Sequence, residues 1–195
     1  ALDTVSGVAG KQSHLPILSH VYIKAEGALV LMVATNLEIA LRVSIRAKVD
    51  VTGEYTVPAK MMQDTIRLLT GDQVVIEREG EELVVSSGRS VVHVKGSPSD
   101  DYPVMPDPQG EHSYTLLVAP LQKSLERVVS SVSRSEVRPE LSGVCWRFFS
   151  EYHNGLILAA TDSYRLAEQK MSVAQGDGGF SAIVPGKTVS EMLRI

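Results

Sequence analysis

Basic residues recur at matching positions in the two halves of the chain, and the chemistry open to them is contact with phosphate. Lys60 and Arg67 stand seven residues apart, and Lys187 and Arg194 repeat that spacing. Seven residues are close to two helical turns, so each pair is expected to share one face of a helix. Lysine and arginine bind phosphate oxygens without reading base sequence. The pattern therefore indicates a basic surface suited to a polyanion.

A further basic series follows Pro120, where we expect a helix to begin because proline is favoured in the first helical turn. Lys123, Arg127 and Arg134 are spaced by four and seven residues along this helix. Arg138 follows in a loop. Acidic residues instead gather in an expected strand hairpin over residues 77–82.

The alternative is an ordinary solvated helix face, on which acids four residues away neutralise the bases. Lys60 has Asp64 at that spacing, and Lys187 has Glu191. Recurrence at equivalent places favours a functional surface over this alternative. The net charge of −4 argues only weakly against a polyanion partner, because binding depends on where the positive charges lie.

No set of residues assembles an enzyme site. Cys145 falls in an expected strand, which predicts a buried structural cysteine. The five histidines show no metal-ligand spacing, and residues 185–188, Pro-Gly-Lys-Thr, lack the upstream glycine of a phosphate-binding loop. Asp162, after Thr161, is expected to cap a turn that follows a buried strand. We therefore expect no catalysis and no metal or cofactor.

The composition is that of an ordinary globular protein, with 44% apolar and 22% charged residues among 195. Aromatic residues make up 5%, too few for base stacking to be a main activity. No apolar run is long enough for a transmembrane helix, and the start shows no signal-peptide pattern. The single cysteine fits a reducing compartment.

An internal repeat sets the expected domain organisation. Three segments return in order at offsets of 123 to 127 residues: 15–21 at 138–144, 29–36 at 155–162, and 57–60 at 184–187. Such a slow drift is expected when loops lengthen between two copies of one domain. Residues 96–110 hold four of the nine prolines and are expected to form an extended linker. We place the boundary near Gly110, with domains at 1–110 and 111–195.

Both ends of the chain are expected to be cut. The second copy begins with a strand-like run at 113–118, whereas in the first copy a helix is already running at Leu2. The first copy continues in strands beyond residues 57–60, whereas the second stops inside the matching helix. The chain is therefore expected to be a piece of a longer protein.

Each copy is predicted to be an α+β unit with two helices and antiparallel strands. In the first copy, apolar runs flank residues 25–27 and 79–82, which predicts two hairpins, and 90–95 reads as a further strand. Residues 61–69 have a helical apolar period, with Gly71 as the stop. The predicted order is helix, hairpin, strand, helix, hairpin.

The motifs at 15–18, 34–38, 57–60, 87–90 and 160–167 together resemble the bacterial sliding clamp, the beta subunit of DNA polymerase III, over essentially the whole chain. The resemblance implies tandem DNA-clamp domains, each with two helices packed on antiparallel sheets, and a homodimeric ring that encircles double-stranded DNA. It implies a non-catalytic, cytoplasmic processivity factor for DNA replication. The chain would supply most of domain one and the first part of domain two.

The resemblance also implies which residues meet DNA. They are Lys11, Gln12, Lys60, Arg67, Arg134, Ser135, Arg138, Lys187 and Arg194. Gln12 stands where a basic residue can occur, and Lys11 beside it is the substitute. The loop at 139–140 lacks the aromatic residues that some clamps carry there.

Two protein-binding surfaces are implied as well. A hydrophobic cleft would take linear motifs from DNA polymerase subunits, the clamp loader, repair polymerases and ligase. Its domain-two wall matches Leu141, Thr161, Ser163, Tyr164, Arg165 and Leu166, although Leu141 and Leu166 could instead be plain core residues. The dimer interface would use an edge strand that includes Arg89, Ser90, Val92 and Val94, and its exposed valines would be an aggregation risk if unpaired.

The alternative from another class is a tandem-repeat protein-interaction module without a role at DNA.

Overall fold

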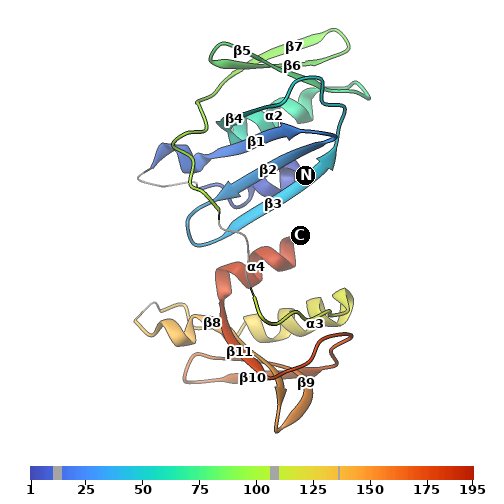
Figure 1. The fold of residues 1–195 in the computed structure, drawn as a ribbon. Coiled ribbons are helices and arrows are strands. Elements are labelled where there is room, and N and C mark those ends of the chain that lie inside the picture. The colour runs from blue at the N-terminus through green and yellow to red at the C-terminus, as the bar shows by residue number, and fades with distance from the viewer. Residues whose placement is uncertain (11–14, 106–109, 136) are drawn as a thin grey trace. The chain divides into compact units, whose positions relative to one another are not determined.

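The structure, a computed structural model, describes residues 1–10, 15–105, 110–135 and 137–195. Internal contacts divide the chain into two units, Ala1–Pro106 and Asp107–Ile195 (Figure 1). This division falls a few residues before Gly110. Within the described residues, no helix is long and apolar enough to cross a membrane.

A four-stranded antiparallel sheet organises the first unit. Its strands are β1 (His20–Glu26), β2 (Leu29–Thr35), β3 (Ala40–Arg46) and β4 (Gly53–Pro58), in the order β3-β2-β1-β4. A two-residue loop joins β1 to β2, and Gly27 at its start has a φ of 63°, as the first position of a type II′ turn requires. The predicted hairpin is confirmed. The single strand predicted before the second helix is wrong, because β3 and β4 both form there.

Helices α1 (Leu2–Ser6) and α2 (Ala59–Leu68) contact each other and the sheet (Figure 1). Helix α2 buries Ala59, Met62 and Thr65, which recur every three residues and so lie on one side of the helix. These side chains join a core with Val5 of α1 and Val21 of β1. The helix predicted over residues 61–69 is therefore confirmed.

Strands β5 (Val75–Glu79), β6 (Glu82–Ser87) and β7 (Ser90–Lys95) form a second sheet in that order. Gly80, with a φ of 60°, opens the two-residue loop between β5 and β6. Leu83, Val85 and Val94 contribute to the same core as α2. The predicted second hairpin and the strand at 90–95 are confirmed.

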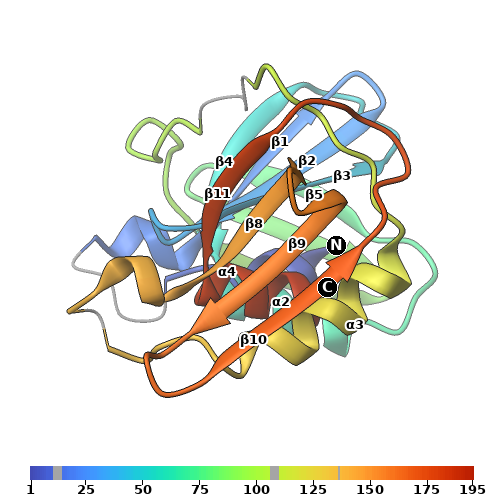
Figure 2. The same cartoon turned by 90° about the horizontal axis from the view of Figure 1, so that it is seen from below.

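The second unit repeats the first arrangement. Strands β8 (Gly143–Ser150), β9 (His153–Thr161), β10 (Leu166–Met171) and β11 (Phe180–Pro185) form a sheet in the order β10-β9-β8-β11. Helices α3 (Val118–Val129) and α4 (Gly186–Arg194) pack together on one of its faces (Figure 2). Short 3₁₀ helices, η1 (Pro16–Ser19) and η2 (Pro139–Leu141), precede β1 and β8. The predicted α+β class and the internal repeat are therefore confirmed.

The start of the second unit differs from its prediction. Residues 113–118 form no strand, and only Thr115 makes an isolated bridge, to Gln175. Tyr114 turns inward and stacks on Phe148, with ring centroids 3.8 Å apart. Helix α3 begins at Val118, not at Pro120. Proline is tolerated at this third helical position because the N–H groups of the first turn have no helical partner.

The end of α3 also differs from its prediction. The helix stops at Val129, so Arg134 lies in the following loop and not on the helix. Ser131 N donates to Val128 O, and Ser130 Oγ donates to Arg127 O, which closes the last turn. Serine side chains compete for backbone groups in this way and disfavour continued helix.

The prediction of a buried Cys145 is wrong. Its neighbours Val144 and Trp146 are buried against the helices, whereas Cys145 is half-buried on the opposite face of β8. Alternation along a strand places consecutive side chains on opposite faces.

Candidate functional site

The basic pair of the first unit lies on the exposed side of α2, opposite its buried residues. The side chains of Lys60 and Arg67 are 88% and 60% exposed. Lys60 Nζ lies 3.7 Å from Asp64 Oδ2, so the ion pair of the alternative interpretation does form. Exposed pairs of this kind contribute little free energy, and a phosphate can displace the acid.

Arg67 has a partner that the sequence pattern did not reveal. Its Nη2 donates to Asp3 Oδ1 at 2.7 Å, and Gln63 Nε2 donates to the same oxygen at 2.6 Å. These hydrogen bonds, that of Gln63 first, hold the pKa of Asp3 below its ordinary value. The ionised carboxylate on α1 therefore orients Arg67 on α2. Asp3 is far from Arg67 in sequence, so no local spacing could have identified the contact.

The second unit presents the equivalent pair on α4. Lys187 and Arg194 are exposed, whereas Val189 between them is buried. Arg194 Nε lies 2.7 Å from Glu191 Oε2. Each unit therefore carries two cations on the exposed side of its second helix, with acids that neutralise part of the charge.

The remaining residues expected to contact DNA lie between α3 and β8 or outside the residues that the structure describes. Arg134, Ser135 and Arg138 are all exposed in the segment that leads into η2. Ser133 holds this segment, because its N donates to Leu141 O at 2.9 Å and its Oγ accepts from Ser135 N at 3.1 Å. Lys11 and Gln12 lie outside the described residues.

Most of the expected cleft residues meet in the turn between β9 and β10. Asp162 Oδ1 accepts hydrogen bonds from the N–H groups of Tyr164 and Arg165 at 3.1 and 3.0 Å, and the predicted capping turn is confirmed. Thr161 Oγ1 donates to Arg165 O at 2.7 Å, and Ser163 has a φ of 76°. The bond from Tyr164 N is the first cause that keeps the pKa of Asp162 low.

This turn projects apolar side chains into solvent. Tyr164 is 98% exposed and Leu166 is 70% exposed, so the alternative of Leu166 as a core residue is wrong. Leu141 is half-buried on η2. The first unit has the same turn, in which Asn36 Oδ1 accepts from Glu38 N and Ile39 N, and Leu37 has a φ of 73°.

Strand β7 carries three of the four expected dimer residues and directly follows the fourth, Arg89. It is an edge strand of its described sheet. Arg89 and Ser90 are exposed, and Val92 is 36% exposed. Val94 has no exposed surface and packs in the core, so the expectation of an exposed Val94 is wrong. Val91, 58% exposed, is the prominent apolar side chain of this strand.

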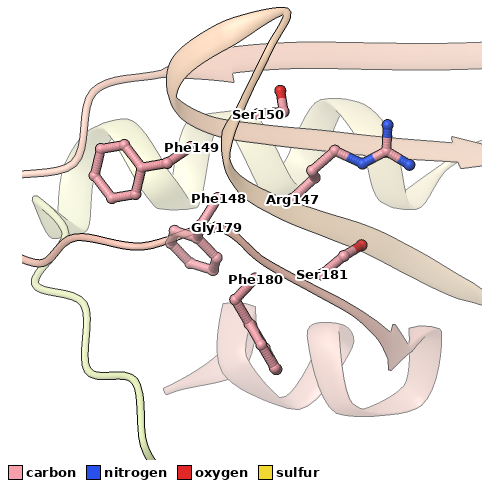
Figure 3. Close-up of a pocket in the computed structure, with 7 residues that line it drawn as sticks. All are labelled: Arg147, Phe148, Phe149, Ser150, Gly179, Phe180 and Ser181. Carbon is pink, nitrogen blue, oxygen red and sulfur yellow. The ribbon is translucent and has the colours of Figure 1, made fainter.

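A shallow hollow of about 260 Å³ lies beside a bulge in β8, where Phe149 has a φ of 46°. Figure 3 shows the Arg147 and Ser181 side chains extending away from the rings of Phe149 and Phe180. The register pairs Arg147 with Ser181 across β8 and β11. The bulge thus separates a basic and polar side of the strand from an aromatic one.

Comparisons with known proteins match both units. A family model described as the DNA polymerase III beta subunit, N-terminal domain, matches residues 1–106, and one described as the central domain of the same subunit matches residues 115–195. A beta sliding clamp from Proteus mirabilis is 34% identical over 100% of this chain and 53% of its own length. One from Staphylococcus epidermidis is 31% identical over 99% of this chain and 52% of its own length. The chain thus spans about half the length of the curated relatives it matches.

Solved structures agree with the sequence relatives. A DNA polymerase sliding clamp from Pseudomonas aeruginosa, crystallised with a ligand, matches with a TM-score of 0.89 and 29% identity, over 99% of this chain and 52% of that one. A sliding clamp from Caulobacter crescentus gives 0.87 and 29%, over 100% and 54%.

Proposed function

Because this chain belongs to the DNA polymerase III beta subunit family, we propose that it is part of a DNA sliding clamp, a processivity factor that encircles double-stranded DNA. The observation that carries the proposal is the recurrence of one basic pair on the exposed side of the second helix in each repeat. Such cations contact phosphates without sequence preference, which suits a ring that must slide. The tandem-repeat module without a DNA role is not favoured.

The proposed DNA contacts are seven exposed residues of the described part of the chain and two residues outside it. They are Lys60, Arg67, Lys187 and Arg194 on the helices, Arg134, Ser135 and Arg138 before η2, and Lys11 and Gln12. Weak contacts suffice for this function, since closure of a ring around DNA prevents escape without tight binding. No covalent step is required of any residue, which agrees with a non-catalytic subunit.

The β9–β10 turn and Leu141 are proposed to form one wall of a cleft that binds linear motifs of polymerases, the clamp loader and repair proteins. Support comes from Tyr164 and Leu166, which are apolar, exposed and held on a hydrogen-bonded turn. A rigid turn loses little conformational entropy when a peptide binds.

Strand β7 is proposed to take part in a homodimer ring. The support is its edge position and the exposure of Val91 and Val92. Arg89 and Ser90 at its start would contribute polar contacts at the rim of that interface.

A charge-neutralisation series tests the proposed DNA contacts. Lys60→Gln, Arg67→Gln, Lys187→Gln and Arg194→Gln are introduced into the full-length protein, and DNA binding is measured against salt concentration. Each phosphate contact that is lost should lower the salt slope by about 1. Arg46→Gln, on β3, is the matched control and should leave the slope unchanged. Equal slopes for all five variants and the parent would refute the assignment of this face to DNA.

A further inference from the structure

A hollow in the second unit lies on the face of the β8–β11 sheet opposite α3 and α4, and none of the proposed sites uses it. Its volume is about 340 Å³. Side chains that line it include Cys145, Arg147, Tyr152, Ile157, Glu168 and Lys170.

Strand register puts this hollow on the same sheet face as part of the proposed cleft. Thr161 of the cleft wall pairs with Leu166 across β9 and β10. Two residues earlier in β9, Ala159 pairs with Glu168, and four residues earlier Ile157 pairs with Lys170. Alternate residues of a strand project to one side, so the three pairs form successive rows on one face.

Strand β8 extends these rows. Cys145 pairs with Ala159, and Arg147 pairs with Ile157. The row that holds Arg147 thus lies four strand residues from Thr161, a distance of about 13 Å at 3.3 Å per residue. An extended peptide spans the same distance with about four residues.

The side chains that line the hollow carry a net positive charge. Lys170 Nζ lies 3.4 Å from Glu168 Oε1, which compensates that lysine. The side chain of Arg147 makes no ion pair or hydrogen bond within the described parts of the chain. Its guanidinium extends away from the neighbouring aromatic rings (Figure 3). The hollow therefore offers one uncompensated fork of N–H donors, which suits a carboxylate.

The floor of the hollow is apolar. Ile157 is 8% exposed, and Ala159 and Cys145 are half-buried beside it. The Tyr152 side chain, 69% exposed, stands at the rim. An ion pair formed over such a floor is less screened by water than one on an open surface.

We propose that this hollow binds an acidic side chain of the same partner peptide whose apolar residues occupy the cleft, about four residues from them along the peptide. The inference rests on the proposed role of the β9–β10 turn as a cleft wall. It adds a charge-based determinant of partner choice: partners with a glutamate or aspartate at that distance bind more tightly than those without.

The test uses the full-length protein and synthetic fluorescein-labelled peptides. Each peptide has an apolar core of two leucines and a phenylalanine, a three-serine spacer, and two glutamates or two glutamines. The acidic pair is placed at the amino end in one set and at the carboxyl end in another, so that the experiment determines in which direction the peptide binds. Affinity is measured by fluorescence polarisation, and alkylation of Cys145 by iodoacetamide is followed by mass spectrometry.

In one of the two orientations, the glutamate peptide should bind about fivefold more tightly than its glutamine counterpart, an effect at the upper end for one exposed charge pair. It should also slow the alkylation of Cys145. Arg147→Gln should abolish the difference and leave the affinity of the glutamine peptide unchanged. Arg46→Gln, on the other unit, removes the same charge and should preserve the difference.

The outcomes separate this inference from the function on which it rests. If both peptides bind with equal affinity in both orientations, the hollow is not an acidic subsite and the cleft stands. If Arg147→Gln weakens both peptides equally, the residue supports the cleft and does not select acid. If no peptide binds, the cleft proposal fails, and this inference fails with it.

Discussion

At the scale of single residues, the lysine and arginine side chains proposed to face DNA differ in how nearby acidic side chains hold them. Arg67 shares Asp3 with Gln63, and the depressed pKa of Asp3 keeps its carboxylate ionised. Lys60 is held more loosely, 3.7 Å from Asp64. Asp3 therefore both orients Arg67 and repels an approaching phosphate.

Asp3→Asn should strengthen DNA binding by the full-length protein. The change removes one negative charge from the proposed DNA side and frees the Arg67 guanidinium. Affinity should rise by about two- to fivefold at low salt, and the gain should shrink as salt increases. Titration of labelled duplex DNA at two salt concentrations measures the effect, and weaker binding would show that orientation of Arg67 outweighs repulsion.

Leu166→Ala should weaken peptide binding without unfolding the protein. The side chain is 70% exposed, so the free energy of unfolding should change by less than about 0.5 kcal/mol. Affinity for an apolar-core peptide should fall by at least about fivefold, since a buried anchor commonly contributes more than 1 kcal/mol. Leu29→Ala, at a 49% exposed position in the first unit, is the control. Equal peptide affinities for the two variants would remove Leu166 from the cleft.

The placement of functional residues was partly predictable from the sequence. The spacing of Lys60 and Arg67 predicted a shared exposed helix face, and Thr161-Asp162 predicted a capped turn, because both depend on residues a few positions apart. The Asp3–Arg67 contact and the grouping of Arg147 with Lys170 depend on how distant elements pack. Such contacts cannot be predicted from the spacing of residues in the sequence.

At the scale of elements, β7 divides its valines between two roles. Val94 is fully buried against the core that includes α2, whereas Val91 faces solvent. Val94→Ala should lower the free energy of unfolding by about 1–3 kcal/mol through the cavity it leaves. Val91→Ala, the matched control, should change it by less than about 0.5 kcal/mol.

Urea unfolding of both β7 variants measures this difference. Dimerisation of the full-length protein is followed by sedimentation. Relative to its effect on the free energy of unfolding, Val91→Ala should weaken dimerisation more than Val94→Ala does. Equal stability losses would contradict the placement of Val94 in the core.

The junction of β1 and β4 should carry a pH-dependent contribution to stability. Thr56 Oγ1 donates to Ser97 O at 2.9 Å and can therefore accept from His20 Nδ1, 3.1 Å away. Burial lowers the pKa of His20 below 6.5. The neutral form is favoured in the fold, so its contribution is present above about pH 6.5 and declines as the pH falls through the lowered pKa.

His20→Asn should flatten this dependence. Urea midpoints compared between pH 7.5 and 5.5 should fall more steeply for the parent than for the variant, because only the parent must keep a histidine uncharged. Parallel pH profiles would show that His20 does not titrate in this range.

Element types were mostly predictable, and element ends were not. A helical apolar period predicted α2, and apolar runs on either side of turn residues predicted both hairpins of the first unit. Helix α3 begins at Val118, before the predicted Pro120, because proline is tolerated in the first helical turn. It ends at Val129, before Arg134, because a serine side chain closes the last turn. These are local competitions of small free energy that periodicity does not resolve.

At the scale of the whole molecule, the two units share one strand order, and each carries a basic pair on the exposed side of its second helix. Each unit also has exposed apolar residues on a turn or an edge strand. The repeat was predictable, because three segments recur in order. The two units span about half the length of the curated relatives, so ring closure is proposed for the full-length protein and not for these two units alone. The proposed function is therefore topological: we propose that the full-length protein holds DNA by surrounding it.

Retention on circular DNA, compared with retention on linear DNA, measures whether the protein surrounds the duplex. The full-length protein is loaded by its clamp loader onto nicked circular DNA, isolated by gel filtration, and then divided into cut and uncut samples at moderate salt. The protein should stay with the circle and should be lost after a single restriction cut. Equal retention on circular and linear DNA would contradict this proposal.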